Sequence, residues 1–209
     1  MIVSHRHRFI FAAVPKTGTH SVRHALRAHL GPDDIEQARL FAEKTFPYPE
    51  LAKVGHGHLS FEDVRPFLGE AAWSTYRKFA FVRNPFDRFV SYCAFATSRD
   101  GAFLRDPKGV MRHFLFTAPP LQHMVFRPQH SFLTGPDGTL QSDLLGNVET
   151  MQESYDAIAT SIGISSTPLE RVNASRHADW RTYYDPELVR GVEKIYGADL
   201  ELFGYSFDG

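Results

Sequence analysis

The sequence predicts an α/β fold built on a mostly parallel central sheet with helices on both faces. Two apolar segments, residues 9–14 and 78–83, are typical of buried strands, and helix-forming segments follow them over residues 22–30 and 85–97. Strands that alternate with helices are typical of parallel sheets covered by helices. A chain of 209 residues with 43% hydrophobic residues is long enough to bury a core, so we expect a single domain over residues 1–209.

The segment after the first strand is Pro15-Lys16-Thr17-Gly18-Thr19-His20-Ser21. The first backbone N–H groups of a helix lack partners within the helix, and they attract anions. Lys16 adds a positive charge, and the hydroxyls of Thr17, Thr19 and Ser21 add hydrogen-bond donors. Lys16 precedes Gly18, whereas in the nucleoside-triphosphate P-loop the lysine follows the glycines. The segment therefore predicts a site for a phosphorylated or sulfated ligand, with an ordinary turn and a solvated lysine as the alternative.

The second strand ends at Arg83, and Asn84-Pro85 follows as a helix N-cap with proline in the first helical position. A parallel strand delivers the residue at its carboxyl end to a ligand crevice, so we expect Arg83 and Ser91 to contact one phosphate. For Asp87 and Arg88 we expect only a solvated helix face. The opposite, apolar side of this helix consists of Phe86, Phe89, Val90, Cys93 and Thr97.

A His56-Gly57-His58 segment lies between these two motifs. Histidine is the side chain best suited to accept a proton near neutral pH, and residues i and i+2 of an extended segment point to the same side. We expect Ser60 to cap a short helix over residues 61–68, ended by Gly69, which would fix the position of the histidines. The alternatives are a packed structural histidine and a pair of metal ligands, although no third ligand stands at a convincing spacing. We expect His58 to be the catalytic base, with His56 second.

The motifs Pro-Lys-Thr-Gly-Thr-x-Ser and Arg-Asn-Pro-x-x-Arg-x-x-Ser together resemble the nucleotide motifs of sulfotransferases that use 3′-phosphoadenosine 5′-phosphosulfate (PAPS). The His-Gly-His segment is similar to the acceptor-activating histidines of heparan sulfate 2-O-sulfotransferases, so the resemblance is to the carbohydrate and bacterial type. It implies a P-loop-like three-layer sandwich and PAPS as co-substrate. We expect no metal to be required, because Lys16, Arg83 and the helix N-terminus can neutralise the nucleotide. It also implies that the first motif holds the 5′-phosphosulfate and the second the 3′-phosphate. The cofactor-binding residues that it implies are Lys16, Thr17, Gly18, Thr19, Ser21, Arg83 and Ser91, with His20 at a position where relatives carry a hydroxyl residue.

The C-terminal third predicts two core-facing amphipathic helices, over residues 149–163 and 185–196. Residues 118–140 are expected to be irregular, with a turn at 135–138 that joins two short strands around Phe132 and Leu140. In the family that the chain resembles, a late basic loop often closes over the nucleotide. The resemblance therefore makes Arg176, or else Arg181, a further cofactor-binding candidate.

Composition narrows the choice of partners and location. A formal net charge of −1 argues against general nucleic-acid binding, so a polyanionic sugar would need local positive charge. The candidates for that charge are Arg23, Arg27, Arg105, Lys108, Arg112 and Arg127. Cys93 is the single cysteine, so we expect no internal disulfide and a small core residue. No apolar run approaches the roughly 20 residues that span a membrane, and the first one is too short for a signal segment, so we expect a cytoplasmic protein.

The predicted activity is in-line transfer of a sulfuryl group from PAPS to a hydroxyl-bearing acceptor. His58 would remove the acceptor's proton, and Lys16 would stabilise the charge on the leaving phosphate. A carbohydrate is the expected acceptor, while a metabolite alcohol, a lipid-linked sugar and a peptide tyrosine stay open. Two alternatives remain: a small-molecule or nucleotide kinase, for which we find no convincing aspartate at a strand end, and an inactive nucleotide-binding module.

Overall fold

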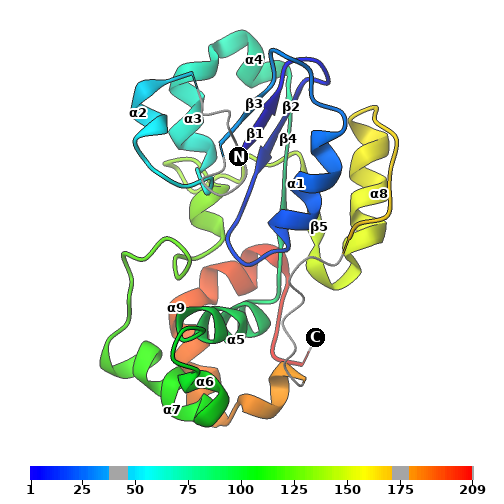
Figure 1. Cartoon of the computed structure of the whole chain (residues 1–209). Coiled ribbons are helices and arrows are strands. Elements are labelled where there is room, and N and C mark those ends of the chain that lie inside the picture. The colour runs from blue at the N-terminus through cyan, green and yellow to red at the C-terminus, as the bar shows by residue number, and fades with distance from the viewer. Residues whose placement is uncertain (38–46, 171–178, 209) are drawn as a thin grey trace. The chain divides into compact units, whose positions relative to one another are not determined.

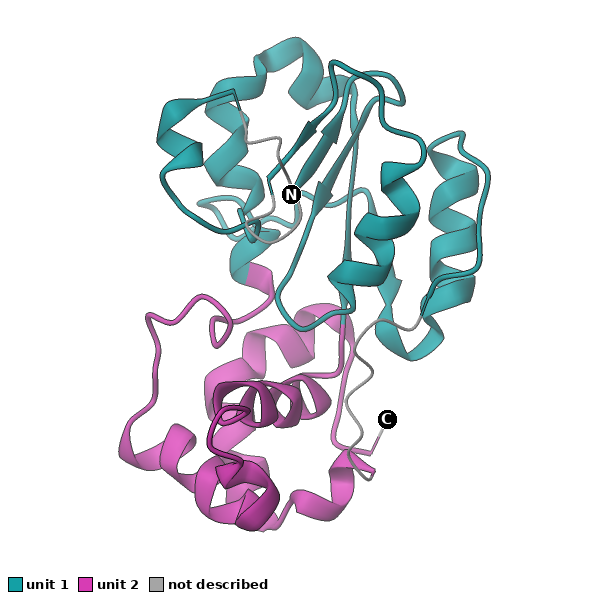
Figure 2. Ribbon diagram, viewed as in Figure 1, with its two compact units in different colours: residues 1–82, 131–172 teal, residues 83–130, 173–209 magenta. Residues whose placement is uncertain are grey.

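The structure, a computed structural model, describes residues 1–37, 47–170 and 179–208. The chain divides into two compact units, residues 1–82 with 131–172 and residues 83–130 with 173–209 (Figure 2). That residues 1–209 act as a single domain stays a prediction.

The first unit is built on a mixed sheet (Figure 1). In the part of the chain that the structure describes, its strands have the order β3-β1-β2-β4-β5. The parallel pairs are β2 with β4 and β4 with β5, and β1 is antiparallel to both β2 and β3. The strands are β1 (Ile2–Ser4), β2 (Phe9–Ala12), β3 (Ile35–Glu36), β4 (Arg77–Val82) and β5 (Leu144–Asn147).

The α/β class is confirmed, but the prediction of a mostly parallel sheet is wrong on one side of β2. The short strand β1 was not predicted, because the start of the chain is polar and basic. Its Ile2 and Val3 are fully buried. Strand β5 was also missed, because a segment that contains Gly146 looks like a loop. That glycine allows a close approach, since a Cβ placed there would lie 2.6 Å from the Phe81 ring.

Helices cover both faces of this sheet, as predicted, with α1 and α8 on one side (Figure 1). The prediction for α3 is confirmed: Ser60 forms a capping box with Asp63, and Gly69 ends the helix with φ 74°. Around the predicted turn at 135–138, the two expected strands are reduced to one isolated bridge between Thr134 and Leu140. The helices of this unit are α1 (Thr19–Arg27), α2 (Pro49–Ala52), α3 (Phe61–Leu68), α4 (Glu70–Thr75), η3 (Val148–Thr150) and α8 (Met151–Ser161).

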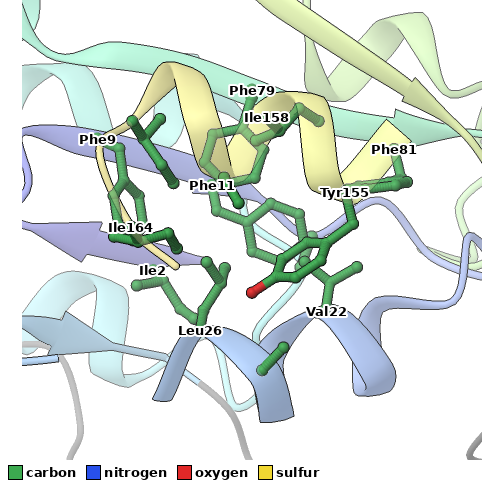
Figure 3. Packing of buried hydrophobic residues seen from close by; sticks show 14 residues of the cluster. Ile2, Phe9, Phe11, Val22, Leu26, Phe79, Phe81, Tyr155, Ile158 and Ile164 are labelled. Atoms are coloured by element: carbon green, nitrogen blue, oxygen red, sulfur yellow. The ribbon is translucent and has the colours of Figure 1, made fainter. Parts of the chain in front are cut away.

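Aromatic side chains of β2 and β4 form the centre of the first core (Figure 3). Residues two apart on a strand face the same side, so Phe9 and Phe11 on β2 lie beside Phe79 and Phe81 on β4. The rings of Phe11 and Phe79 stack with centroids 5.1 Å apart. Helices α1 and α8 close this core with the apolar residues Val22, Leu26, Tyr155 and Ile158.

The second unit is helical, and its core lies between α5 and α9. As predicted, Phe86, Phe89 and Cys93 of α5 are buried, and burial raises the pKa of the Cys93 thiol. Helix α9 runs past the predicted end at residue 196, with a non-helical φ of −114° at Tyr196. The helices of this unit are α5 (Pro85–Ala96), α6 (Ala102–Arg105), α7 (Pro107–Arg112), η1 (His113–Thr117), η4 (Trp180–Tyr183) and α9 (Pro186–Phe203), while η2 (His130–Phe132) spans the boundary in sequence.

The expectation of a solvated face for Asp87 and Arg88 is wrong. Arg88 is 2% exposed, and its Nη2 donates to the carbonyl oxygens of Val125 (3.0 Å) and Arg127 (2.8 Å). Asp87 accepts a hydrogen bond from Nε of Arg83 at 2.7 Å. Helical periodicity placed both residues opposite the apolar stripe, but a segment distant in sequence covers Arg88.

We predict that Arg88→Ala destabilises the protein strongly. Removal of the guanidinium leaves two buried carbonyls without this donor, so the free energy of unfolding should fall by about 3 kcal/mol. Chemical denaturation of the variant measures this loss. The matched control is Arg190→Ala, at an exposed position of α9, which should change the free energy of unfolding by less than about 0.5 kcal/mol. Equal stabilities of the two variants would contradict the assigned role of Arg88.

Candidate functional site

The loop between β2 and α1 adopts an unusual backbone conformation. Lys16 and Gly18 both have left-handed φ values, 66° and 68°. The hydroxyl of Thr17 donates to the carbonyl oxygen of Val14 at 2.9 Å and closes the turn. A left-handed conformation at a residue other than glycine costs about 1–2 kcal/mol, and such strain clusters at ligand sites.

Gly18 is required at its position for two reasons. Its left-handed φ favours glycine, and a Cβ there would lie 2.4 Å from Cε of Met151. The first residue of α8 therefore packs directly against the loop. A Cβ at position 18 would require the end of the Met151 side chain to move.

The N-terminus of α1 offers an environment for an anion. Gly18 is its N-cap, no side chain caps it, and its first turn holds no acidic residue. The first amides of a helix point out of it and carry partial positive charge. Thr19 and Ser21 are buried here, and burial, assisted by the charges of Arg23 and Lys16, lowers the pKa of His20.

The structure brings His58 to the same loop. Nδ1 of His58 lies 2.6 Å from the carbonyl oxygen of Ala13. Because a carbonyl oxygen only accepts hydrogen bonds, Nδ1 of the neutral ring carries the proton and Nε2 carries the lone pair. The ring of His56 lies 6.2 Å from that of His58, and Nδ1 of His56 accepts from the His58 main-chain N–H at 3.3 Å. The lone pair of His58 is thus on Nε2, and His56 contacts the main chain of His58.

Gly57, between the two histidines, lies against other main-chain and side-chain atoms. A Cβ at this position would lie 2.1 Å from the carbonyl oxygen of Gln37 and 2.4 Å from Nη2 of Arg23. That same Nη2 donates to the carbonyl oxygens of Gly57 (2.7 Å) and Gln37 (3.0 Å). The His-Gly-His segment is therefore fixed through the carbonyl of its glycine.

Three of the arginines expected to meet a polyanion are engaged within the protein instead. Arg23 is 5% exposed, and burial lowers its pKa to about 10. Arg27 forms a two-point ion pair with Glu36 at 2.7 and 2.8 Å. Arg112 pairs with Asp185 and Glu187. The sequence alone did not reveal these partners, because they meet the arginines only in the folded chain.

Burial controls the charge of His58. Loss of solvation lowers its pKa to about 3; the bond to Ala13 opposes this effect, and the charges of Arg23 and His56 add to it. The His58 imidazole is consequently neutral at physiological pH, as a proton acceptor must be.

The second motif begins where β4 ends. The parallel register pairs Ala12 of β2 with Ala80 of β4, so both strands end at the same edge of the sheet. The chain then continues into Arg83 and Asn84. Asn84 caps α5 as predicted: its Oδ1 accepts from the Phe86 N–H at 3.0 Å, and its Nδ2 donates to the carbonyl of Ser206 at 2.9 Å.

Arg83 and Ser91 both lie in the second unit. Nε of Arg83 is paired with Asp87, so sequence reasoning missed Asp87 as a partner of the proposed ligand-binding arginine. The opposite charges stand four positions apart, with Asp87 in the first turn of α5, and this spacing is the signal that was available for the pair. Ser91 is 3% exposed on α5. Arg176 lies outside the described residues.

Comparison with known proteins identifies the first part of the chain. Residues 1–95 match the profile of the Sulfotransferase family. Over these residues the chain is similar to the sulfotransferase family. The match includes the Lys16 loop, the His-Gly-His segment and the Arg83 motif, and it supports sulfuryl transfer as the general activity. No curated protein and no solved structure gave a significant match.

The described residues, 1–37, 47–170 and 179–208, contain no group of three or more His, Cys, Asp or Glu side chains placed to hold a metal ion. In the same residues no helix combines the length and the apolar character needed to cross a membrane.

The depressed pKa of His58 predicts a pH effect on stability. In the unfolded chain histidine titrates near 6.5, whereas His58 in the folded protein takes up its proton only near pH 3. Between these values the unfolded state binds more protons, so the contribution of His58 to stability is lost as the pH falls. We therefore expect the free energy of unfolding to fall less steeply in His58→Gln than in the wild type between pH 6.5 and about 4.5.

Chemical denaturation at a series of pH values measures these slopes. The glutamine amide retains a donor for the Ala13 carbonyl but does not titrate. Wild-type and variant slopes that coincide over this window would show that His58 is not buried in its neutral form.

Proposed function

We propose that the protein transfers the sulfuryl group of PAPS to an acceptor hydroxyl, with His58 as the base. The observation that carries this proposal is the hydrogen bond between Nδ1 of His58 and the carbonyl of Ala13. This hydrogen bond orients the His58 ring against Ala13, the first residue of the loop that also contains Lys16. A kinase would have no comparable use for a fixed neutral histidine beside its anion loop.

The donor set of the loop suits a phosphosulfate. Lys16 supplies a positive charge, the start of α1 supplies main-chain donors, and the left-handed φ at position 18 favours glycine. We propose that Lys16, Thr17, Gly18, Thr19, His20 and Ser21 line the 5′-phosphosulfate. PAPS supplies the sulfuryl group when bound.

In the reaction that we propose, Nε2 of His58 takes the proton of the acceptor hydroxyl while its oxygen bonds to sulfur. The bond between sulfur and the bridging phosphate oxygen breaks, and Lys16 compensates the negative charge that develops on that oxygen. The negative charge of a bound nucleotide would raise the pKa of His58 by offsetting Arg23. The base would then be strongest only in the complex. His56 remains the second candidate for this role.

Arg83 and Ser91 are proposed to contact the 3′-phosphate. Asp87 accepts a hydrogen bond from Nε of Arg83 and thereby orients the guanidinium. Arg176 is proposed as a further nucleotide contact. A carbohydrate hydroxyl as acceptor and a cytoplasmic location also stay proposals.

We predict that Arg83→Ala weakens binding of adenosine 3′,5′-bisphosphate by about tenfold or more, because a charge-assisted contact to phosphate is lost. Calorimetric titration without metal measures this loss, and Arg83→Lys should fall between the variant and the wild type. The matched control, Arg190→Ala, should bind as the wild type does. If the wild type binds ATP with Mg²⁺ and not the bisphosphate, the sulfotransferase proposal is wrong and the kinase alternative takes its place.

We predict that His58→Ala lowers turnover with PAPS by about 10²–10⁴-fold, the usual contribution of a general base. Its affinity for the bisphosphate should change by less than about twofold, because the base acts on the acceptor. Sulfate transfer to a panel of carbohydrate and small alcohols provides the assay, and His24→Ala on the exposed face of α1 is the control. Retained turnover in His58→Ala, or its loss in His56→Ala alone, would move the role of base away from His58.

A further inference from the structure

Arg83 occupies a break between two regular elements. The β4–β5 pairing ends at Val82, and the first hydrogen bond of α5 runs from the Arg88 N–H to the Asn84 carbonyl. Neither the strand ladder nor the helix therefore fixes the main chain of Arg83. Its position must come from some other contact.

Gln129 makes that contact with both main-chain groups of Arg83. Its Oε1 accepts from the Arg83 N–H at 2.9 Å, and its Nε2 donates to the Arg83 carbonyl at 2.9 Å. One carboxamide thus replaces the pair of bonds that a neighbouring strand would provide. Gln129 is fully buried, so water does not compete for either bond.

Gln129 is itself held by Asp199 of α9. Oδ2 of Asp199 accepts from the Gln129 N–H at 2.7 Å. Its Oδ1 accepts from the main-chain N–H and from Nδ1 of His130, at 2.8 and 2.7 Å. Asp199 is fully buried, and these three donors satisfy its carboxylate. The position of Gln129 is therefore set by its contact with helix α9.

Arg88 fixes the same segment from α5. Its bonds to the carbonyls of Val125 and Arg127 hold the residues that lead into Gln129. The segment is thus attached to α5 through Arg88, to α9 through Asp199 and to Arg83 through Gln129. Buried networks in which every member has a partner are rigid.

We propose that Gln129, held by Asp199, is a positioning residue that sets the location of Arg83 for the 3′-phosphate. This inference rests on the proposed function, because it takes Arg83 as a ligand-binding residue. Gln129 acts through the main chain of Arg83, and Asp87 acts on its side chain at Nε. A displaced Arg83 costs affinity only for a nucleotide that carries the 3′-phosphate.

The test compares two nucleotides on the intact chain, adenosine 3′,5′-bisphosphate and adenosine 5′-monophosphate. Gln129→Met keeps the length of the side chain and loses both bonds to Arg83. We expect about tenfold weaker binding of the bisphosphate and less than about twofold change for the monophosphate, as measured by calorimetry. Gln122→Met, at an exposed position of the same unit, is the matched control and should alter neither affinity.

Gln129→Glu retains an acceptor for the Arg83 N–H and loses the donor to its carbonyl, so an intermediate loss is expected. This variant carries the test if Gln129→Met does not fold. A folded variant that binds both nucleotides as the wild type does, or that weakens both equally, overturns the positioning role. A wild type that does not prefer the bisphosphate overturns the proposed role of Arg83 itself, and the inference falls with it.

Discussion

The parallel pairing of β2 with β4 is the constraint on which the rest of the structure depends. It makes both strands end at one edge of the sheet, and each motif that we propose to bind the nucleotide is the direct continuation of one of these strands. The stacking of Phe11 on Phe79 beneath α1 and α8 maintains this register. A slip by one residue would turn these rings to the opposite face of the sheet and open the core. The packing of the phenylalanines therefore also fixes the points at which the Lys16 loop and the Arg83 segment leave the sheet.

Buried arginines hold the irregular segments of both units. Arg23 donates to the carbonyls of Gln37 and Gly57, and Arg88 donates to those of Val125 and Arg127. The guanidinium suits this task because it is planar, stays charged and offers several donors in a fixed geometry. Burial of these charges is costly, and the carbonyl partners offset the loss of solvation. The two arginines thus stabilise loops. Their guanidinium groups bind main-chain carbonyls inside the protein and add no positive charge to its surface.

His58 shows how one contact sets the chemistry of a side chain. The carbonyl of Ala13 selects the tautomer that leaves the lone pair on Nε2, and burial keeps the ring neutral. Close packing around Gly57, where Arg23 and Gln37 leave no space for a Cβ, removes the freedom of the segment that carries it. A base with a low pKa in the free protein is compatible with catalysis when a bound anion raises it, since loss of nearby positive potential favours the protonated form. The neighbours that set the charge of His58, Ala13 and Arg23, therefore also fix the position of its ring and of its segment.

The sequence by itself determined the local elements: the strands that became β2 and β4, the caps at Ser60, Asn84 and Asp185, and the position of the loop between β2 and α1. These follow from apolar runs, capping residues and glycines, which act over a few neighbouring positions. Only the tertiary structure decided the mixed pairing of the sheet, the strand β5, and the burial of Arg23 and Arg88. It also decided the contact of Gln129 with Arg83, which joins residues 46 positions apart. Such partners depend on how the whole chain packs, and no periodicity or short motif encodes a bond between groups that meet only after folding.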